Sequence, residues 1–156
     1  MTYDVRITHH LPRHLAVTEF QARPEQMGEL QGKAFATVLG YLTARGLAPA
    51  GPAVSRYVMR GDHFDVASGF VVAAPVEGDD TVVPLLLQET DVATTMHVGP
   101  YDELGKAYDA LEVGARDQGR AVDVSAPMWE EYLSGPDVPP EQTVTLVYWP
   151  VLPLTS

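Results

Sequence analysis

Two adjacent glutamates, Glu130 and Glu131, lie among large aromatic and apolar side chains in the segment APMWEEYLSGP (residues 126–136). The segment is strand-like, and successive side chains of a strand point to opposite faces of a sheet. Glu130 would then share a face with Tyr132, and Glu131 would share the other face with Trp129. We predict that Glu130 points inward and Glu131 outward, because an inward carboxylate is costly unless it is paired, hydrogen-bonded or matched by a ligand. The alternative is a Glu130 that lies exposed on the sheet and has no function.

The charge of the chain is strongly asymmetric. The 156-residue sequence has a net charge of −11, with seven Lys/Arg against seven Asp/Glu in residues 1–78 and three against fourteen in residues 79–156. Such a field repels nucleic acid and anionic lipid and attracts cations, although its ordinary meaning is a solvated surface. We expect neither direct nucleic-acid binding nor membrane association. The chain also has no cysteine, no signal-like start and no apolar run long enough to span a membrane, which together indicate a cytoplasmic protein.

The histidines give little support to a metal site. His10 and His14 are four residues apart, a spacing that aligns ligands on a helix, but Pro12 lies between them and His9 precedes them in an extended stretch. We therefore predict no bound metal. The sequence also lacks a phosphate-binding loop, a dinucleotide fingerprint and a nucleophile elbow, so no cofactor is predicted. His97 precedes a Gly-Pro pair, where it could either reach a ligand or form a hydrogen-bonded strand end.

The chain contains an internal repeat at an offset of 75 residues. The segment PAVSRY (52–57) matches PMWEEY (127–132), and VVAAPV (71–76) matches LVYWPV (146–151). Identities are few, so the shared order of elements is the better evidence for a duplication. In this alignment the tyrosines at the ends of the first pair of segments correspond, whereas a serine of the first repeat is replaced by Glu130 in the second.

Each repeat has the order strand, helix, strand, strand. Apolar residues at three- and four-residue steps predict helices over residues 27–41, with Gly46 as the C-terminal cap, and over residues 101–111 after a Gly-Pro start. Strand-like runs cover residues 5–20 with a break at Pro12, and residues 53–59, 65–72, 85–98, 126–133 and 143–149. One helix cannot cover both faces of a three-stranded piece, so the halves must pack together. We predict a single α+β domain over residues 1–156, built from repeats at about 1–76 and 83–156 with pseudo-twofold symmetry and a central ligand cleft.

The sequence resembles the GyrI-like superfamily, whose members are effector-binding domains of AraC-type and MerR-type regulators and free-standing proteins. The resemblance rests on HVGPYDELGKAYDAL (97–111), on the Pro-x-x-Glu-x-Tyr spacing that ends at Tyr132, and on the final TVTLVYWPV (143–151). It spans nearly the whole chain and implies a duplicated strand–helix–strand–strand fold with a cleft for small, often cationic and aromatic molecules. Within that pattern it places Glu130 and Tyr132 in the ligand cleft. No residues before Tyr3 could hold a DNA-binding domain, so we expect a stand-alone form that does not act as a transcription factor without a partner.

A cleft with one carboxylate and several aromatic rings attracts cations through both Coulomb attraction and the ring quadrupoles. The candidate ligand-contacting residues are Glu130, Tyr132, Tyr57, Trp129, His97, Tyr101 and Trp149. Aromatic side chains at such spacings are often core residues instead. Tyr101 and Tyr108 lie on the apolar stripe of the second helix and are expected in the core. Tyr148 and Trp149 alternate on the last strand, so only one of them can face the cleft.

Three functions are compatible with these residues. The first, which we favour, is a non-catalytic protein that binds a cationic or amphipathic aromatic compound, with Glu130 as the counter-charge. The second is a hydrolase of strained electrophilic molecules such as cyclopropanes, an activity found in some similar proteins, with Glu130 as general base. The third is an acidic module for a protein partner, such as a gyrase modulator, which would bind in a salt-sensitive way.

Overall fold

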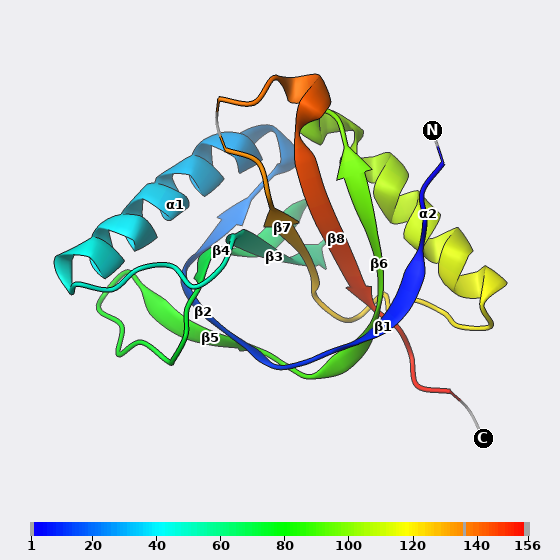
Figure 1. Cartoon of the computed structure of the whole chain (residues 1–156), viewed down its shortest axis with the longest axis horizontal. Helices are drawn as coiled ribbons and strands as arrows, with labels where there is room; N and C mark the ends of the chain where they lie inside the picture. The colour runs from blue at the N-terminus through cyan, green and yellow to red at the C-terminus, as the bar shows by residue number, and fades with distance from the viewer. Residues whose placement is uncertain (1, 136, 155–156) are drawn as a thin grey trace. The chain divides into compact units, whose positions relative to one another are not determined.

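The computed structural model describes residues 2–135 and 137–154 and has the predicted α+β architecture (Figure 1). The strands are β1 (Arg6–His10), β2 (Arg13–Ala22), β3 (Ala53–Arg60), β4 (His63–Val71), β5 (Val83–Leu87), β6 (Thr90–Val98), β7 (Met128–Tyr132) and β8 (Val144–Pro150). The helices are α1 (Met27–Ala44) and α2 (Leu104–Asp117), with short 3-10 helices at Pro24–Gln26, Tyr101–Glu103 and Pro140–Gln142. The predicted run over residues 85–98 is therefore two strands, β5 and β6.

Local backbone conformation accounts for the end of α1 and for the start of α2. Beyond the end of α1, Gly46 adopts a φ of 67°, the left-handed conformation that a glycine cap allows. The second helix begins later than expected, because the residues after Pro100 form a 3-10 turn before α2 starts at Leu104. Tyr101 lies in that turn and is 52% exposed, so the prediction that it lies in the core is wrong.

The chain forms two compact units, which do not follow the predicted repeat boundaries. The N-terminal unit comprises residues 12–88, and the C-terminal unit comprises the described residues of 1–11 and 89–156. In the N-terminal unit the antiparallel strands have the order β5-β2-β4-β3, with α1 packed on β2 and β4 (Figure 1). In the C-terminal unit the order is β1-β6-β8-β7, with α2 packed on β6, β8 and β1. The first strand of each repeat thus pairs with the second strand of the other repeat.

Each unit has its own apolar core between helix and sheet. The core of the N-terminal unit contains Ala16, Val38, Tyr41, Leu42, Val72, Val76 and Val82. The core of the C-terminal unit contains Ala93, Ala107, Leu111, Ala115, Val147, Trp149 and Val151. Residues paired across antiparallel strands share a face of the sheet. Pairing of Glu130 with Val147 therefore places Glu130 on the face that α2 covers, and pairing of Glu131 with Leu146 places Glu131 on the opposite face.

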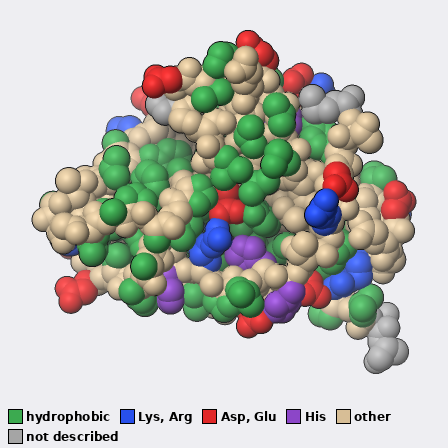
Figure 2. All heavy atoms as spheres, viewed as in Figure 1, with side chains coloured by type: hydrophobic (Ala, Val, Ile, Leu, Met, Phe, Trp, Pro, Cys, Tyr) green, Lys and Arg blue, Asp and Glu red, His purple; other side chains and the backbone are tan. Residues whose placement is uncertain are grey.

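In the described part of the chain, neither helix combines the length and apolarity needed to cross a membrane. On the face drawn in Figure 2, Lys and Arg side chains stand apart from one another rather than forming one basic patch.

Candidate functional site

Glu130 lies at the centre of a group of tyrosines in the C-terminal unit. Its side chain is 5% exposed, and both carboxylate oxygens accept hydrogen bonds from phenols. Tyr108 of α2 donates to Oε2 at 2.6 Å, and Tyr132, two residues along β7, donates to Oε1 at 2.6 Å. These two hydrogen bonds stabilise a carboxylate that is buried away from water. Glu130 is thus inward-facing, as expected.

Tyr101 connects this buried group to the surface. Its ring packs edge-on against Tyr132, with ring centroids 5.8 Å apart and an interplanar angle of 89°. Burial, together with the negative charge of Glu130, raises the pKa of the Tyr101 hydroxyl above its usual value. The electrostatic effect of Glu130 therefore reaches a ring that is half exposed. We call Glu130, Tyr101, Tyr108 and Tyr132 the Glu130 cluster.

The N-terminal unit has the corresponding arrangement with uncharged groups. Gln31 of α1 donates to the hydroxyl of Tyr57 and, at 3.1 Å, to Ser55 Oγ. Ser55 lies 2.6 Å from the hydroxyl of Ser68 on the neighbouring strand. In both repeats a helix side chain thus bonds to the same strand position, Ser55 or Glu130, and a carboxylate occupies that position only in the second repeat. Tyr57 is 8% exposed within this network.

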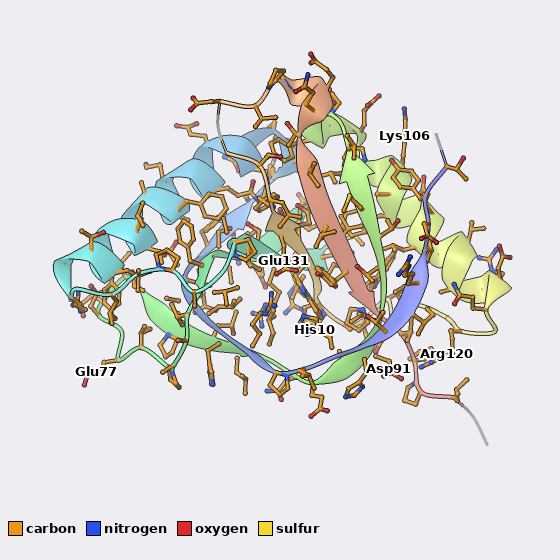
Figure 3. The ribbon with its side chains drawn as sticks, viewed as in Figure 1. His10, Glu77, Asp91, Lys106, Arg120 and Glu131 are labelled. Carbon is orange, nitrogen blue, oxygen red and sulfur yellow. The ribbon has the colours of Figure 1, made fainter. Side chains whose placement is uncertain are left out.

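Glu131 is not solvated, which corrects the prediction that it points outward. It is 4% exposed and accepts a hydrogen bond from the hydroxyl of Tyr148. Trp129 shares its face and stacks on Tyr148 with ring centroids 5.4 Å apart, while His10 packs edge-on against both rings. Figure 3 labels Glu131 on β7 and His10 on β1. The alternation of the strand was predicted correctly, but both faces of β7 are covered, so alternation did not imply exposure.

These contacts divide the predicted site residues between the two faces of one sheet. Tyr132 lies on the same face as Glu130, and so does Trp149, whose strand neighbour Ala93 is in the core under α2. Trp149 packs edge-on against Tyr108 and donates from Nε1 to the carbonyl oxygen of Asp123 at 3.0 Å. Trp129 lies on the other face and does not join the Glu130 cluster. Of the last-strand pair, Trp149 rather than Tyr148 therefore shares the face of Glu130.

His97 is fully buried and bonded at both ring nitrogens. The carbonyl oxygen of Pro100 can only accept, so Nε2 of His97 donates to it at 3.0 Å, and the hydroxyl of Tyr3 lies 2.9 Å from Nδ1. His97 thus forms the hydrogen-bonded strand end, the second of the two interpretations left open by the sequence. It fixes the turn that carries Tyr101, and Gly99 in that turn has a φ of 139°.

Tyr108 is the member of the Glu130 cluster that the sequence did not identify. Its place on the apolar stripe of the helix predicted a core residue, and its ring does pack in the core of the C-terminal unit. Its hydroxyl, however, requires a partner once the ring is buried, and this requirement was the available signal. Glu130 meets it across the interface between α2 and β7.

The N-terminal histidines take part in separate contacts. His9 lies between two carboxylates, with Nε2 2.5 Å from Glu89 Oε2 and Nδ1 2.8 Å from Asp91 Oδ1. Asp91 also accepts a bond from Arg120 at 3.4 Å, and Figure 3 shows these two side chains close together. Within the described residues, no three His, Asp or Glu side chains are grouped so as to hold a metal ion.

We expect His9 to titrate above its ordinary pKa of about 6.5. Both ring nitrogens face carboxylates, so both must donate, and hydrogen bonds to Glu89 and then Asp91 raise the pKa of His9. Because the folded pKa is raised, this stabilisation is complete below the unfolded value and is lost as the pH rises through the folded value. Proton NMR titration should give the raised pKa, and urea unfolding should show stability falling across this range in the wild type. A His9→Gln variant with an unchanged pH dependence would contradict this assignment.

The structure is similar to several solved structures over nearly its whole length. It matches the C-terminal domain of EcmrR with a TM-score of 0.78 and 17% identity, covering 99% of this chain and 100% of that one. It matches a hydrolase from Listeria innocua with a TM-score of 0.68 and 13% identity, covering 95% and 91%. It matches SAV2435 bound to tetraphenylphosphonium with a TM-score of 0.66 and 12% identity, covering 97% and 94%. At these identities the likeness shows the fold alone.

Three further comparisons limit and extend this result. The chain spans 57% of the EcmrR chain in an EcmrR–DNA complex, with a TM-score of 0.80 and 17% identity. No curated protein sequence matches the chain. The model of the GyrI-like small molecule binding domain matches residues 4–152, and the resemblance noted in the sequence is thereby confirmed. The chain belongs to the GyrI-like small molecule binding domain family.

Proposed function

We propose that the Glu130 cluster binds a lipophilic aromatic cation. The observation that carries this proposal is a buried carboxylate whose two oxygens are held by phenols, beside an aromatic ring that is half exposed. A cation stacked on Tyr101 would be attracted by the ring quadrupole and by the charge of Glu130. The low dielectric of the partly buried site strengthens the second attraction relative to water.

In this proposal the predicted residues have different roles. Tyr101 and Tyr132 are the aromatic contact surface, and Glu130 is the counter-charge. Tyr108 and Tyr132 fix the orientation of the carboxylate through their hydroxyls. His97 acts indirectly, because both of its nitrogens are used to hold the turn before α2. A site of this kind is preorganised, so little ordering cost is added when a ligand binds.

The likeness to SAV2435 supports the class of ligand. That protein was solved bound to tetraphenylphosphonium, a permanent cation that carries four phenyl rings. A delocalised cation of this kind has a low hydration cost and offers apolar surface in several directions. It is therefore a suitable first probe for a site made of one carboxylate and several phenols.

Isothermal titration with tetraphenylphosphonium and with tetraphenylborate tests the proposal. The two ions have nearly the same shape and opposite charge, so their comparison isolates the electrostatic contribution. We expect saturable binding of the phosphonium and no detectable binding of the borate. Equal affinity for both ions, or no saturable binding of the phosphonium, would reject the role of Glu130 as a counter-charge.

Hydrolysis is the alternative chemistry, since one structural neighbour is a hydrolase from Listeria innocua. The geometry favours binding, because both oxygens of Glu130 already accept hydrogen bonds from phenols, whereas a general base must take a proton from water. Incubation with a cyclopropane-bearing substrate followed by mass spectrometry separates the two. Substrate recovered intact supports binding, and a ring-opened product that requires Glu130 supports hydrolysis.

A further inference from the structure

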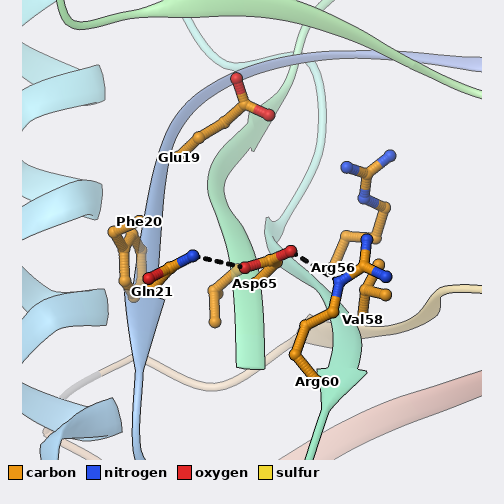
Figure 4. Close-up of a pocket in the computed structure, with 8 residues that line it drawn as sticks. Glu19, Phe20, Gln21, Arg56, Val58, Arg60 and Asp65 are labelled. Carbon is orange, nitrogen blue, oxygen red and sulfur yellow. Dashed lines mark hydrogen bonds and ion pairs between the residues drawn. The ribbon is translucent and has the colours of Figure 1, made fainter. Parts of the chain in front are cut away.

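A cavity of about 450 Å³ lies in the N-terminal unit, on β2, β3 and β4. Its volume falls within the usual range for small-molecule sites, roughly 300–1,000 Å³. It is lined by Glu19, Phe20, Gln21, Arg56, Val58, Arg60, Asp65 and Val66 (Figure 4). Glu19 and Arg56 both pair with Ala67 across their strands, so they share one face of this sheet. The alternate residues of β3, Ser55 and Tyr57, point to the other face, where α1 lies.

Most of the charge in this cavity is already neutralised. Arg60 Nε donates to Asp65 Oδ2 at 2.8 Å, and Gln21 donates to the other oxygen of Asp65 at 3.2 Å. The bond from Arg60 is the main reason that the pKa of Asp65 lies below its usual value. Figure 4 shows both contacts as dashed lines. Arg60 and Asp65 therefore form a compensated pair at one side of the cavity.

Arg56 is different, because its guanidinium is partly desolvated and forms no ion pair in the described part of the chain. Its Nε is buried and has no hydrogen-bond partner among the described residues. Burial lowers the pKa of Arg56 below its usual value, and the nearby charge of the Glu19 carboxylate partly opposes this shift. Among the described residues, no carboxylate lies within 4.0 Å of the Arg56 guanidinium to form an ion pair. Figure 4 shows the guanidinium of Arg56 apart from the Asp65–Arg60 pair. A buried donor left unsatisfied costs about 1–3 kcal/mol, so such a group in a native structure points to a missing acceptor.

We propose that this cavity is a second ligand site, which binds a small organic monocarboxylate through Arg56. The planar guanidinium presents parallel N–H groups that match the two oxygens of a carboxylate. Because Arg56 forms no ion pair with the residues that the structure describes, its guanidinium can bind one carboxylate, whereas a phosphate dianion would bring a second negative charge beside Glu19 and Asp65. Val58, which alternates with Arg56 on the same face of β3, supplies apolar surface for the body of the ligand. The site lies in a different unit from the Glu130 cluster and takes a ligand of opposite charge.

Fluorine NMR with 4-fluorobenzoate tests this site, because it detects weak binding directly on the probe. We expect saturable binding to the wild type and an affinity at least about tenfold weaker in Arg56→Gln, which removes the charge and the paired donors. Arg56→Lys keeps the charge without the planar fork and should bind with intermediate affinity. Arg6→Gln, an exposed strand arginine of the other unit, makes the same change in net charge and should bind like the wild type.

The outcomes separate this site from the Glu130 cluster. Glu130→Gln should keep fluorobenzoate binding, and Arg56→Gln should keep tetraphenylphosphonium binding. Equal weakening by Arg56→Gln and Arg6→Gln would show a general charge effect and overturn the site. Absence of saturable fluorobenzoate binding would overturn it as well. Inorganic phosphate that competes as well as fluorobenzoate would overturn the assignment to a monocarboxylate. Circular dichroism establishes whether each variant is folded. If Arg56→Gln does not fold, Arg56→Lys provides the test.

Discussion

Replacing Glu130 with glutamine is expected to weaken tetraphenylphosphonium binding about 10- to 100-fold, equivalent to about 1.4–2.7 kcal/mol. The change keeps the size of the side chain and removes the one buried negative charge of the cluster. Glutamine has one side-chain oxygen where glutamate has two. Either Tyr108 or Tyr132 would therefore face the amide nitrogen and lose its acceptor. Isothermal titration of wild type and variant measures the loss directly. The effect should appear in the affinity, with stoichiometry unchanged.

The matched control is Glu131→Gln. Glu131 is the adjacent residue, is equally buried and accepts from a tyrosine, but it lies on the opposite face of β7. Its replacement changes net charge by the same amount, and we expect less than a twofold change in affinity. If both variants weaken binding equally, the site is not on the face covered by α2. Tyr101→Ala removes an exposed ring without a core contact and should cost about 0.5–1 kcal/mol, so it tests the same site if Glu130→Gln is unstable.

Replacing Gly69 with alanine is expected to lower the free energy of unfolding by about 3 kcal/mol or more. Gly69 lies in β4 between Val17 of β2 and Val54 of β3. A Cβ at this position would lie 1.8 Å from the carbonyl oxygen of Ala16 and 2.8 Å from the Cα of Val17. Backbone atoms inside a sheet cannot move aside as a flexible side chain can, so the strands must separate locally. Urea unfolding followed by circular dichroism measures the loss.

The control for this effect is Gly40→Ala in α1. An added Cβ there has no atom within 4 Å outside the local helix backbone, and the residue is exposed. Alanine is favoured over glycine in a helix interior by about 0.5–1 kcal/mol, so this variant should be more stable than the wild type. Opposite signs are therefore expected for the same chemical change. A Gly69→Ala variant as stable as the wild type would show that β2 and β4 do not approach as closely as described.

The sequence predicted the secondary structure well because its signals are local. Three- and four-residue apolar steps marked both helices, and Gly46 marked the end of α1. The repeat offset of 75 residues aligned Ser55 with Glu130, and the structure places both under a helix with a helix side chain bonded to each. Two local predictions were wrong. The run over residues 85–98 is two strands, and Tyr101 lies in a 3-10 turn, which has residue spacing similar to that of an α-helix over a single turn.

The pairing of strands was not predictable in the same way. Each repeat reads as a complete strand–helix–strand–strand unit, yet β1 pairs with β6 and β5 pairs with β2. Strands pair through backbone hydrogen bonds, which are the same for every sequence, so the residues of a strand do not specify which other strand it pairs with. The Arg56 cavity escaped detection for a related reason, since its lining residues come from β2 and from the β3–β4 hairpin, which are distant from each other in sequence.

The sequence by itself determined the two helices, the duplication, the acidic second half and the opposite directions of Glu130 and Glu131. These features depend on composition or on spacings of a few residues, which backbone geometry converts directly into structure. Tertiary structure alone decided that both glutamates are buried, that Tyr108 bonds to Glu130, and that Arg56 has a desolvated charge. Burial and hydrogen-bond partners depend on what packs against a residue from elsewhere in the chain, and local spacing does not contain that information.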